Sequence, residues 1–168
     1  MKKATIKHLY ISPDHNYFGR YGMDSLKHPI VERDSLELVA GSGIVSDRFF
    51  DYEPDYKGQI TFFDWAVYKQ VASKFDVNGL VPSVFRRNVI VDGVNLNDLI
   101  GKRFQINGME FTGSCECSPC FWMDEAVADG SEKFLRGQGG LRARIVSGGS
   151  LVPGDTDFKV LGDIDDEA

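Results

Sequence analysis

Three cysteines, at positions 115, 117 and 120, lie close together in the segment 112–123. Ser118 and Pro119 precede Cys120, and serine is favoured as a helix N-cap and proline at the first helical position. A helix beginning here would place Cys120 among backbone N–H groups without intrahelical partners. We therefore expect Cys120 to form a thiolate more readily than an ordinary cysteine, as metal binding and sulfur chemistry both require. The alternative is that Cys120 is a small buried hydrophobic side chain.

The number and spacing of the cysteines predict free thiols. Three is an odd number, and all three lie within one short segment, which favours a reducing compartment over a disulfide framework. Cys-x-Cys-x-x-Cys is also typical of metal sites, but a closed zinc site needs four ligands. His8, His15 and His28 all lie near the N-terminus. A zinc site would require the fold to bring one of them to the cysteines, and we do not expect one.

Composition limits the classes of partner. The chain has 168 residues, of which 42% are hydrophobic, enough for the core of one domain. A net charge of −6 argues against a nucleic-acid partner. No apolar run has the length of a membrane helix. Lys2 and Lys3 resemble the start of a signal peptide, but charged residues interrupt the run that follows and no cleavage site is present. We expect a cytoplasmic protein without a membrane partner.

The elements that must position the cysteines are mostly short strands. Alternating or β-branched residues predict strands over 5–12, 35–40, 59–62, 84–91, 103–106, 109–112, 141–145 and 158–161. Asn107-Gly108 predicts a hairpin whose second arm runs into the cysteines. The spacing of Val67, Val71 and Phe75 predicts a helix over 64–75, with Asp64 as N-cap.

The remaining segments complete the predicted architecture. Short helical turns are expected over 95–100 and 121–128, the glycine-rich segment 137–140 is expected to be flexible, and 163–168 is an acidic tail. Many short strands, glycine turns and few helices indicate a closed, mostly antiparallel β fold.

These pieces, in this order, resemble the MOSC domain, the C-terminal domain of molybdenum cofactor sulfurases. The resemblance covers about residues 36–161. Its motifs are Gly43-Ile44-Val45-Ser46-Asp47-Arg48, Gln59-Ile60-Thr61, Arg86-Arg87-Asn88, Leu99-Ile100-Gly101, Cys117-Ser118-Pro119-Cys120, Gly139-Gly140-Leu141-Arg142-Ala143-Arg144 and Pro153-Gly154-Asp155. The resemblance implies a closed, Greek-key-like β-barrel with a few short helices. We expect one standalone MOSC domain over residues 1–168.

The resemblance also implies a site. In family members that are molybdoenzymes, the thiolate corresponding to Cys120 is a direct molybdenum ligand, and an electron-transfer protein supports reduction of N-hydroxylated compounds. The Arg86-Arg87-Asn88 segment looks similar to the Arg-x-Asn that helps to hold the pterin of the molybdenum cofactor (molybdopterin). Arg86 or Arg87 would bind a phosphate and Asn88 a pterin edge. Arg48, Arg142 and Arg144 are further candidates for an anionic ligand.

Two other functions stay open. In one, Cys120 accepts a persulfide from a separate pyridoxal-phosphate-dependent cysteine desulfurase and passes the sulfur to a metal–sulfur cofactor, and Cys117 exchanges sulfur with Cys120. In the other, the domain is a non-catalytic anion- or pterin-binding module.

The candidate residues also have structural interpretations. Asp47 and Arg48 would form a surface ion pair of little energetic consequence. Arg87 would hold a loop carbonyl, Gln59 and Thr61 would be plain strand residues, and one of Arg142 and Arg144 would lie on a solvated sheet face. If the site exists, Cys120 faces a cleft lined by at least two of Arg48, Arg86, Arg87 and Arg142.

Overall fold

The computed structural model describes residues 2–13, 30–119 and 123–164. The helices are α1 (Trp65–Lys74), α2 (Met123–Ala126), α3 (Ser131–Leu135) and the 3₁₀ helices η1 (Pro82–Phe85) and η2 (Leu96–Leu99). The strands are β1 (Lys2–Ile11), β2 (Val31–Glu32), β3 (Leu36–Val39), β4 (Gly43–Ile44), β5 (Ile60–Asp64), β6 (Val89–Asp92), β7 (Lys102–Ile106), β8 (Met109–Glu116), β9 (Leu141–Ile145), β10 (Gly149–Leu151) and β11 (Gly154–Asp163).

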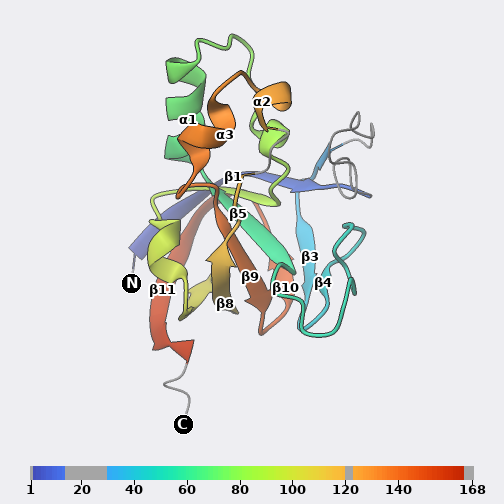
Figure 1. The fold of residues 1–168 in the computed structure, drawn as a ribbon. Coiled ribbons are helices and arrows are strands. Elements are labelled where there is room, and N and C mark those ends of the chain that lie inside the picture. The colour runs from blue at the N-terminus through green and yellow to red at the C-terminus, as the bar shows by residue number, and fades with distance from the viewer. Residues whose placement is uncertain (1, 14–29, 120–122, 165–168) are drawn as a thin grey trace.

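Seven strands form a closed barrel (Figure 1). They pair in the order β11-β7-β8-β9-β5-β6-β1, and β1 pairs again with β11 to close the sheet. Their pairings are antiparallel except that of β5 with β6. A separate small sheet has the order β10-β3-β4. The predicted closed, mostly antiparallel barrel is confirmed.

Aromatic side chains fill the barrel. Phe62, Phe104 and Phe111 each have 0% exposure, and the rings of Phe104 and Phe111 stack with centroids 5.4 Å apart. The alternation in β9 sends Leu141, Ala143 and Ile145 to the interior, as strand periodicity requires. Burying each Phe stabilises the fold by roughly 1.5–3 kcal/mol.

Helices α1, α2 and α3 gather at one end of the barrel (Figure 1). Asp64 caps α1, because its side chain accepts a hydrogen bond from the Ala66 N–H at 2.9 Å. Val67 and Val71 are the buried face of this helix, and they belong to a second core cluster with the stacked rings of Phe63 and Phe85. The helix predicted over 64–75 is therefore confirmed. Among the described residues, no helix is long and apolar enough to cross a membrane.

The structure corrects three local expectations. The strand predicted over 84–91 is wrong in its first half, because Pro82 starts η1 and Arg86 ends it in the left-handed conformation, with φ 57°. Strand β6 begins only at Val89. Helix α3 was not predicted, and the last strand begins at Gly154, ahead of the strand predicted over 158–161. The described part of α2 begins at Met123, and Cys120 lies outside the described residues.

Candidate functional site

The hairpin of β7 and β8 delivers Cys117 to the wall of the barrel. Asn107 and Gly108 both have positive φ, 49° and 79°, as a type I′ turn requires. Strand β8 then pairs with β9, with a register shift between Gly113 and Cys115. Just beyond the strand, the Cys117 N–H donates to the Gly140 carbonyl at 2.8 Å. Cys117 is 5% exposed and is a free thiol.

Arg87 holds the main chain around Cys117. Its guanidinium donates to three carbonyl oxygens, those of Phe85 at 2.8 Å, Cys117 at 3.0 Å and Gly139 at 3.1 Å. Three segments that are distant in sequence are therefore joined through one side chain. This arrangement matches the structural interpretation, in which Arg87 ties down a loop carbonyl.

The segment 137–140 packs directly against Cys117, and its glycines make this possible. A Cβ on Gly139 would lie 2.4 Å from the Cys117 carbonyl oxygen, and one on Gly140 would lie 2.2 Å from the Phe62 carbonyl oxygen. The Glu116 carboxylate accepts from the N–H groups of Gly137 at 3.0 Å and Gly139 at 3.1 Å. The expectation that the segment 137–140 is flexible rested on its glycine content and did not take these packing contacts and hydrogen bonds into account.

Two arginines and a tyrosine lie within electrostatic reach of the Cys117 side chain; we call Cys117, Arg48, Arg142 and Tyr56 the thiol site. Burial acts to lower the pKa of Arg142, but the charge of the Cys117 side chain and a hydrogen bond to it outweigh burial, and the pKa of Arg142 is raised. Burial lowers the pKa of Arg48, against the attraction of Asp47 and Cys117. Burial also raises the pKa of Tyr56, against the opposing charge of Arg142.

Arg48 is held in place by Asp47. Their side chains are 9% and 0% exposed, with Arg48 Nη1 3.6 Å from Asp47 Oδ1, so the interpretation as a surface pair is wrong. Arg48 Nη2 also donates to the Arg86 carbonyl at 3.1 Å, and the guanidinium lies 4.8 Å from the centroid of the Phe49 ring. Separating the two charges of a buried ion pair would leave each of them uncompensated. The pair therefore keeps the Arg48 side chain beside Asp47.

The family model of the MOSC domain matches residues 51–156. This span covers more than half of the chain. The chain belongs to the MOSC domain family. The matched part of the MOSC domain contains three members of the thiol site, Tyr56, Cys117 and Arg142, while Arg48 lies just before it.

Solved structures support the MOSC fold. The YuaD protein from Bacillus subtilis superposes with a TM-score of 0.73 and 21% identity, over 95% of this chain and 96% of that chain. YiiM from Geobacillus stearothermophilus has a TM-score of 0.67 and 11% identity, over 94% and 75%. YiiM from Escherichia coli has a TM-score of 0.60 and 14% identity, over 93% and 71%. Comparison with curated proteins gives no significant match.

Other residues predicted for the MOSC site lie in a buried network beneath it. The Asn88 Oδ1 accepts from the Thr61 N–H at 2.9 Å and hydroxyl at 3.0 Å, and its Nδ2 donates to the Tyr10 carbonyl at 3.2 Å. Gln59 accepts from the Ile145 N–H at 2.9 Å. These contacts give Asn88, Thr61 and Gln59 structural roles, and a cofactor contact by Asn88 stays a prediction.

Arg86 and Arg144 have other partners in the structure. The Arg86 side chain is buried and donates to the Ser12 hydroxyl at 3.0 Å, whereas Arg144 pairs at 3.0 Å with Asp55, whose side chain is 82% exposed. Of the arginines predicted for the site, the structure therefore brings Arg48 and Arg142 within electrostatic reach of the Cys117 side chain, and Arg87 to the Cys117 carbonyl. The Arg86 carbonyl accepts a hydrogen bond from Arg48, and a contact between the Arg86 side chain and a bound anion stays a prediction.

Sequence reasoning missed Tyr56. The available signal was the spacing of Phe49, Tyr52 and Tyr56, whose rings contact one another with centroids 4.8–5.4 Å apart. The cleft predicted for Cys120 falls on a residue outside the described part of the chain. Among the residues that are described, no three His, Cys, Asp or Glu side chains group to hold a metal ion.

Proposed function

We propose that this MOSC domain binds the molybdenum cofactor at the thiol site, with Cys120 as the metal ligand and Arg142 and Arg48 facing the anionic groups of the cofactor. One observation carries the proposal: the Cys117 side chain lies within the electrostatic reach of both the Arg142 and the Arg48 guanidinium groups. Membership of a family associated with this cofactor supports it.

The side chains at the thiol site fit such a ligand. Thiolates are soft metal ligands, and guanidinium groups bind phosphate with paired hydrogen bonds. Arg142 is only partly buried, so it can meet a ligand from solvent. Arg87 and Asn88 already bond to protein groups, and we assign them the role of positioning the walls of the site.

The proposed reaction is reduction of an N-hydroxylated compound, which consumes two electrons and two protons and releases the amine and water. The bound cofactor supplies the two-electron oxygen-transfer chemistry, and an electron-transfer protein supplies the electrons. In the chain itself, the Arg142 and Arg48 guanidinium groups bind the negatively charged groups of the ligand, and Arg87 fixes the Cys117 main chain. Because burial raises the pKa of Tyr56, its hydroxyl stays protonated at neutral pH and can donate to a bound group.

The test measures molybdenum and pterin in protein purified from a host that makes the cofactor. We expect stoichiometric molybdenum in the wild-type protein and loss of most of it in Cys120→Ser. Cys115→Ser is the matched control, because it removes a thiol from the same segment without touching the proposed ligand. Circular dichroism verifies that each variant folds.

Other results would replace the proposal. Absence of molybdenum, together with a labile sulfane sulfur on Cys120 after treatment with a cysteine desulfurase, would establish the sulfur carrier instead. Absence of both would leave an anion-binding module. If molybdenum is bound but an artificial electron donor supports no reduction of N-hydroxylated compounds, cofactor binding stands and the reductase activity is wrong.

A further inference from the structure

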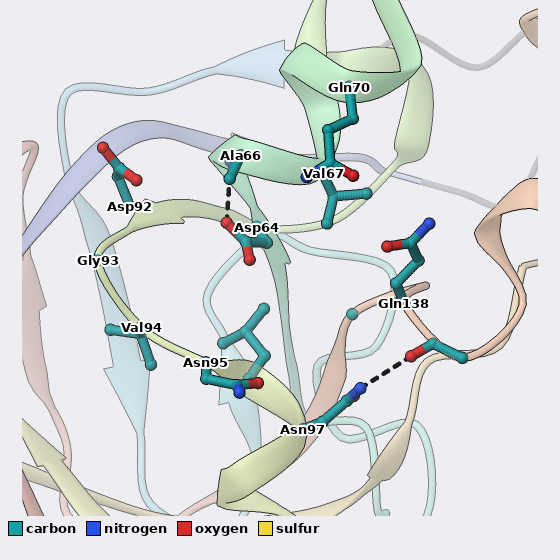
Figure 2. Close-up of a pocket in the computed structure, with 13 residues that line it drawn as sticks. Asp64, Ala66, Val67, Gln70, Asp92, Gly93, Val94, Asn95, Asn97 and Gln138 are labelled. Carbon is teal, nitrogen blue, oxygen red and sulfur yellow. Dashed lines mark hydrogen bonds between the residues drawn. The ribbon is translucent and has the colours of Figure 1, made fainter. Parts of the chain in front are cut away.

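A pocket lies beside the segment 137–140, which also contacts Cys117 (Figure 2). Its volume is about 550 Å³, within the range of small-molecule sites. The start of α1, the turn after β6 and the segment 137–140 form its walls. Gln138 and Gly140 line it, while the carbonyl of Gly139 between them accepts from Arg87. The pocket is thus distinct from the thiol site but shares a wall with it.

The pocket carries negative charge. Asp64 and Asp92 both line it, and no Lys, Arg or His is among the described residues that do. Neither carboxylate belongs to an ion pair within the described part of the chain. Burial raises the pKa of Asp64, against its hydrogen bond from Ala66, and the charge of Asp92 raises it further. The charge of Asp92 is therefore felt at Asp64, and neither carboxylate has an ion-pair partner among the described residues.

Carboxamide and apolar side chains complete the lining of the pocket. Figure 2 shows the side chains of Gln70 and Gln138 directed toward the space between α1 and the segment 137–140. Each carboxamide offers both donors and an acceptor. Val67 of α1 and Val94 after β6 also line the pocket, and both are largely buried and provide apolar contact. A lining of polar groups and apolar side chains is typical of a site for a small organic ligand.

We propose that this pocket binds a small organic cation, with a protonated amine between Asp64 and Asp92 and an apolar body against Val67 and Val94. Two carboxylates without a cation disfavour an anion. Among the described residues, no three metal-ligating side chains group together, and a bare ion would leave most of the pocket volume unfilled. Amine binding here does not depend on the proposed function of the thiol site.

The test compares three probes of similar size and different charge. Benzylamine, benzyl alcohol and benzoate are titrated into ¹⁵N-labelled protein without cofactor, and backbone amide shifts are followed. Benzylamine is expected to shift the amides of Ala66, Gly93 and Gly137 to saturation. Benzyl alcohol should bind about tenfold more weakly or worse, and benzoate should cause no shift at these amides. Equal binding of benzylamine and benzyl alcohol would overturn the proposal, as would benzylamine shifts confined to other regions.

Four variants separate the pocket from general charge effects. Asp64→Asn keeps a good helix N-cap, and Asp92→Asn changes only charge, so both should fold. Each is expected to weaken benzylamine binding about tenfold, and the double variant more. Asp98→Asn is the matched control, because Asp98 is an exposed residue of η2 outside the lining. Unchanged binding in the double variant, or equal weakening in the control, would overturn the proposal.

Separate measurements test the two proposals, so one can be wrong while the other stands. These titrations use protein without cofactor and report only on the pocket, whereas molybdenum content reports only on the thiol site. Loss of benzylamine binding with molybdenum retained would leave the proposed function intact.

Discussion

At the scale of single residues, Arg87 and Asn88 have long-range partners that their local sequence does not reveal. Arg87 bonds to the carbonyl of Gly139, 52 positions away, and Asn88 to that of Tyr10, 78 positions away. The motif Arg86-Arg87-Asn88 therefore predicted that these residues matter, but not whether they face a ligand or the protein. Arg142 was predicted from the same resemblance, and its position beside Cys117 depends on the pairing of β8 with β9.

The buried position of Asp47 leads to a stability prediction. Asp47→Ala should lower the free energy of unfolding by about 3–5 kcal/mol, because it leaves the Arg48 guanidinium buried without its partner. Asp55→Ala is the matched control. Its carboxylate is 82% exposed and pairs with Arg144, so the loss should be below about 1 kcal/mol. Urea denaturation at neutral pH measures both, and equal losses would contradict the buried assignment.

At the scale of elements, the segment 137–140 shows how little amino-acid composition alone predicts about local structure. Its glycines predict flexibility, yet Gly139 and Gly140 are buried and accept hydrogen bonds from Arg87 and Cys117. The glycines are needed because the chain passes too close to the Cys117 and Phe62 carbonyls for a side chain. Close approach is a tertiary property, so no local pattern could distinguish it from a flexible loop.

A side chain at Gly139 should therefore disturb the thiol site. Gly139→Ala places a Cβ 2.4 Å from the Cys117 carbonyl oxygen, and we expect a loss of about 1–3 kcal/mol in stability together with a clear loss of bound molybdenum. Gly101→Ala is the control. Gly101 has φ +79° and open space around it, so alanine there costs about 1–2 kcal/mol without moving Cys117. Chemical denaturation and metal analysis are measured together, and equal molybdenum loss in both variants would contradict the account.

The N-cap of α1 gives a pH-dependent prediction. The pKa of Asp64 is raised above its usual value of 3.8, chiefly by burial, so the folded state binds its proton more tightly than the unfolded state does. The ionised side chain therefore destabilises the fold as pH rises from below 3.8 through the raised pKa. Asp64→Asn keeps the cap and loses this charge. Its stability relative to wild type should increase between pH 3 and pH 7 in urea denaturation, and a constant or opposite difference would contradict this.

At the scale of the whole molecule, the order of strands and turns predicted a closed barrel correctly, but not how it closes. Closure depends on β1 pairing with β11, which brings Lys2 opposite Phe158. Such a pairing has no local signature. The strand expected over 84–91 failed in its first half because β-branched residues there were given more weight than Pro82, which starts η1. Helix α3, Ser131–Leu135, is too short to produce a clear helical period.

The closing strand allows a test of the single-domain expectation. Thr5 pairs with Asp155 of β11 on one side and Asp92 of β6 on the other. Thr5→Pro should cost about 3 kcal/mol or more, because proline removes a ladder donor from a strand paired on both sides. Thr5→Ala, the control, loses only the hydroxyl contact with Asp155 and should cost about 0.5–1.5 kcal/mol.

Unfolding of both variants is followed by far-UV circular dichroism and tryptophan fluorescence. Fluorescence measured in a Trp122→Phe background comes from Trp65 and reports on the helical layer, so coincident transitions indicate one cooperative unit. Separate transitions for the two signals would show that the helical layer and the barrel unfold independently, against the expectation of one domain.

The most direct measurement of the central claim is the molybdenum content of wild-type protein and Arg142→Gln, both isolated from a cofactor-producing host. The glutamine variant removes the guanidinium that contacts Cys117 while leaving β9 and its buried side chains in place. The account predicts stoichiometric molybdenum and pterin in the wild-type protein and a large loss of both in the folded variant. Wild-type protein without molybdenum, or a variant that retains the full content, would contradict it.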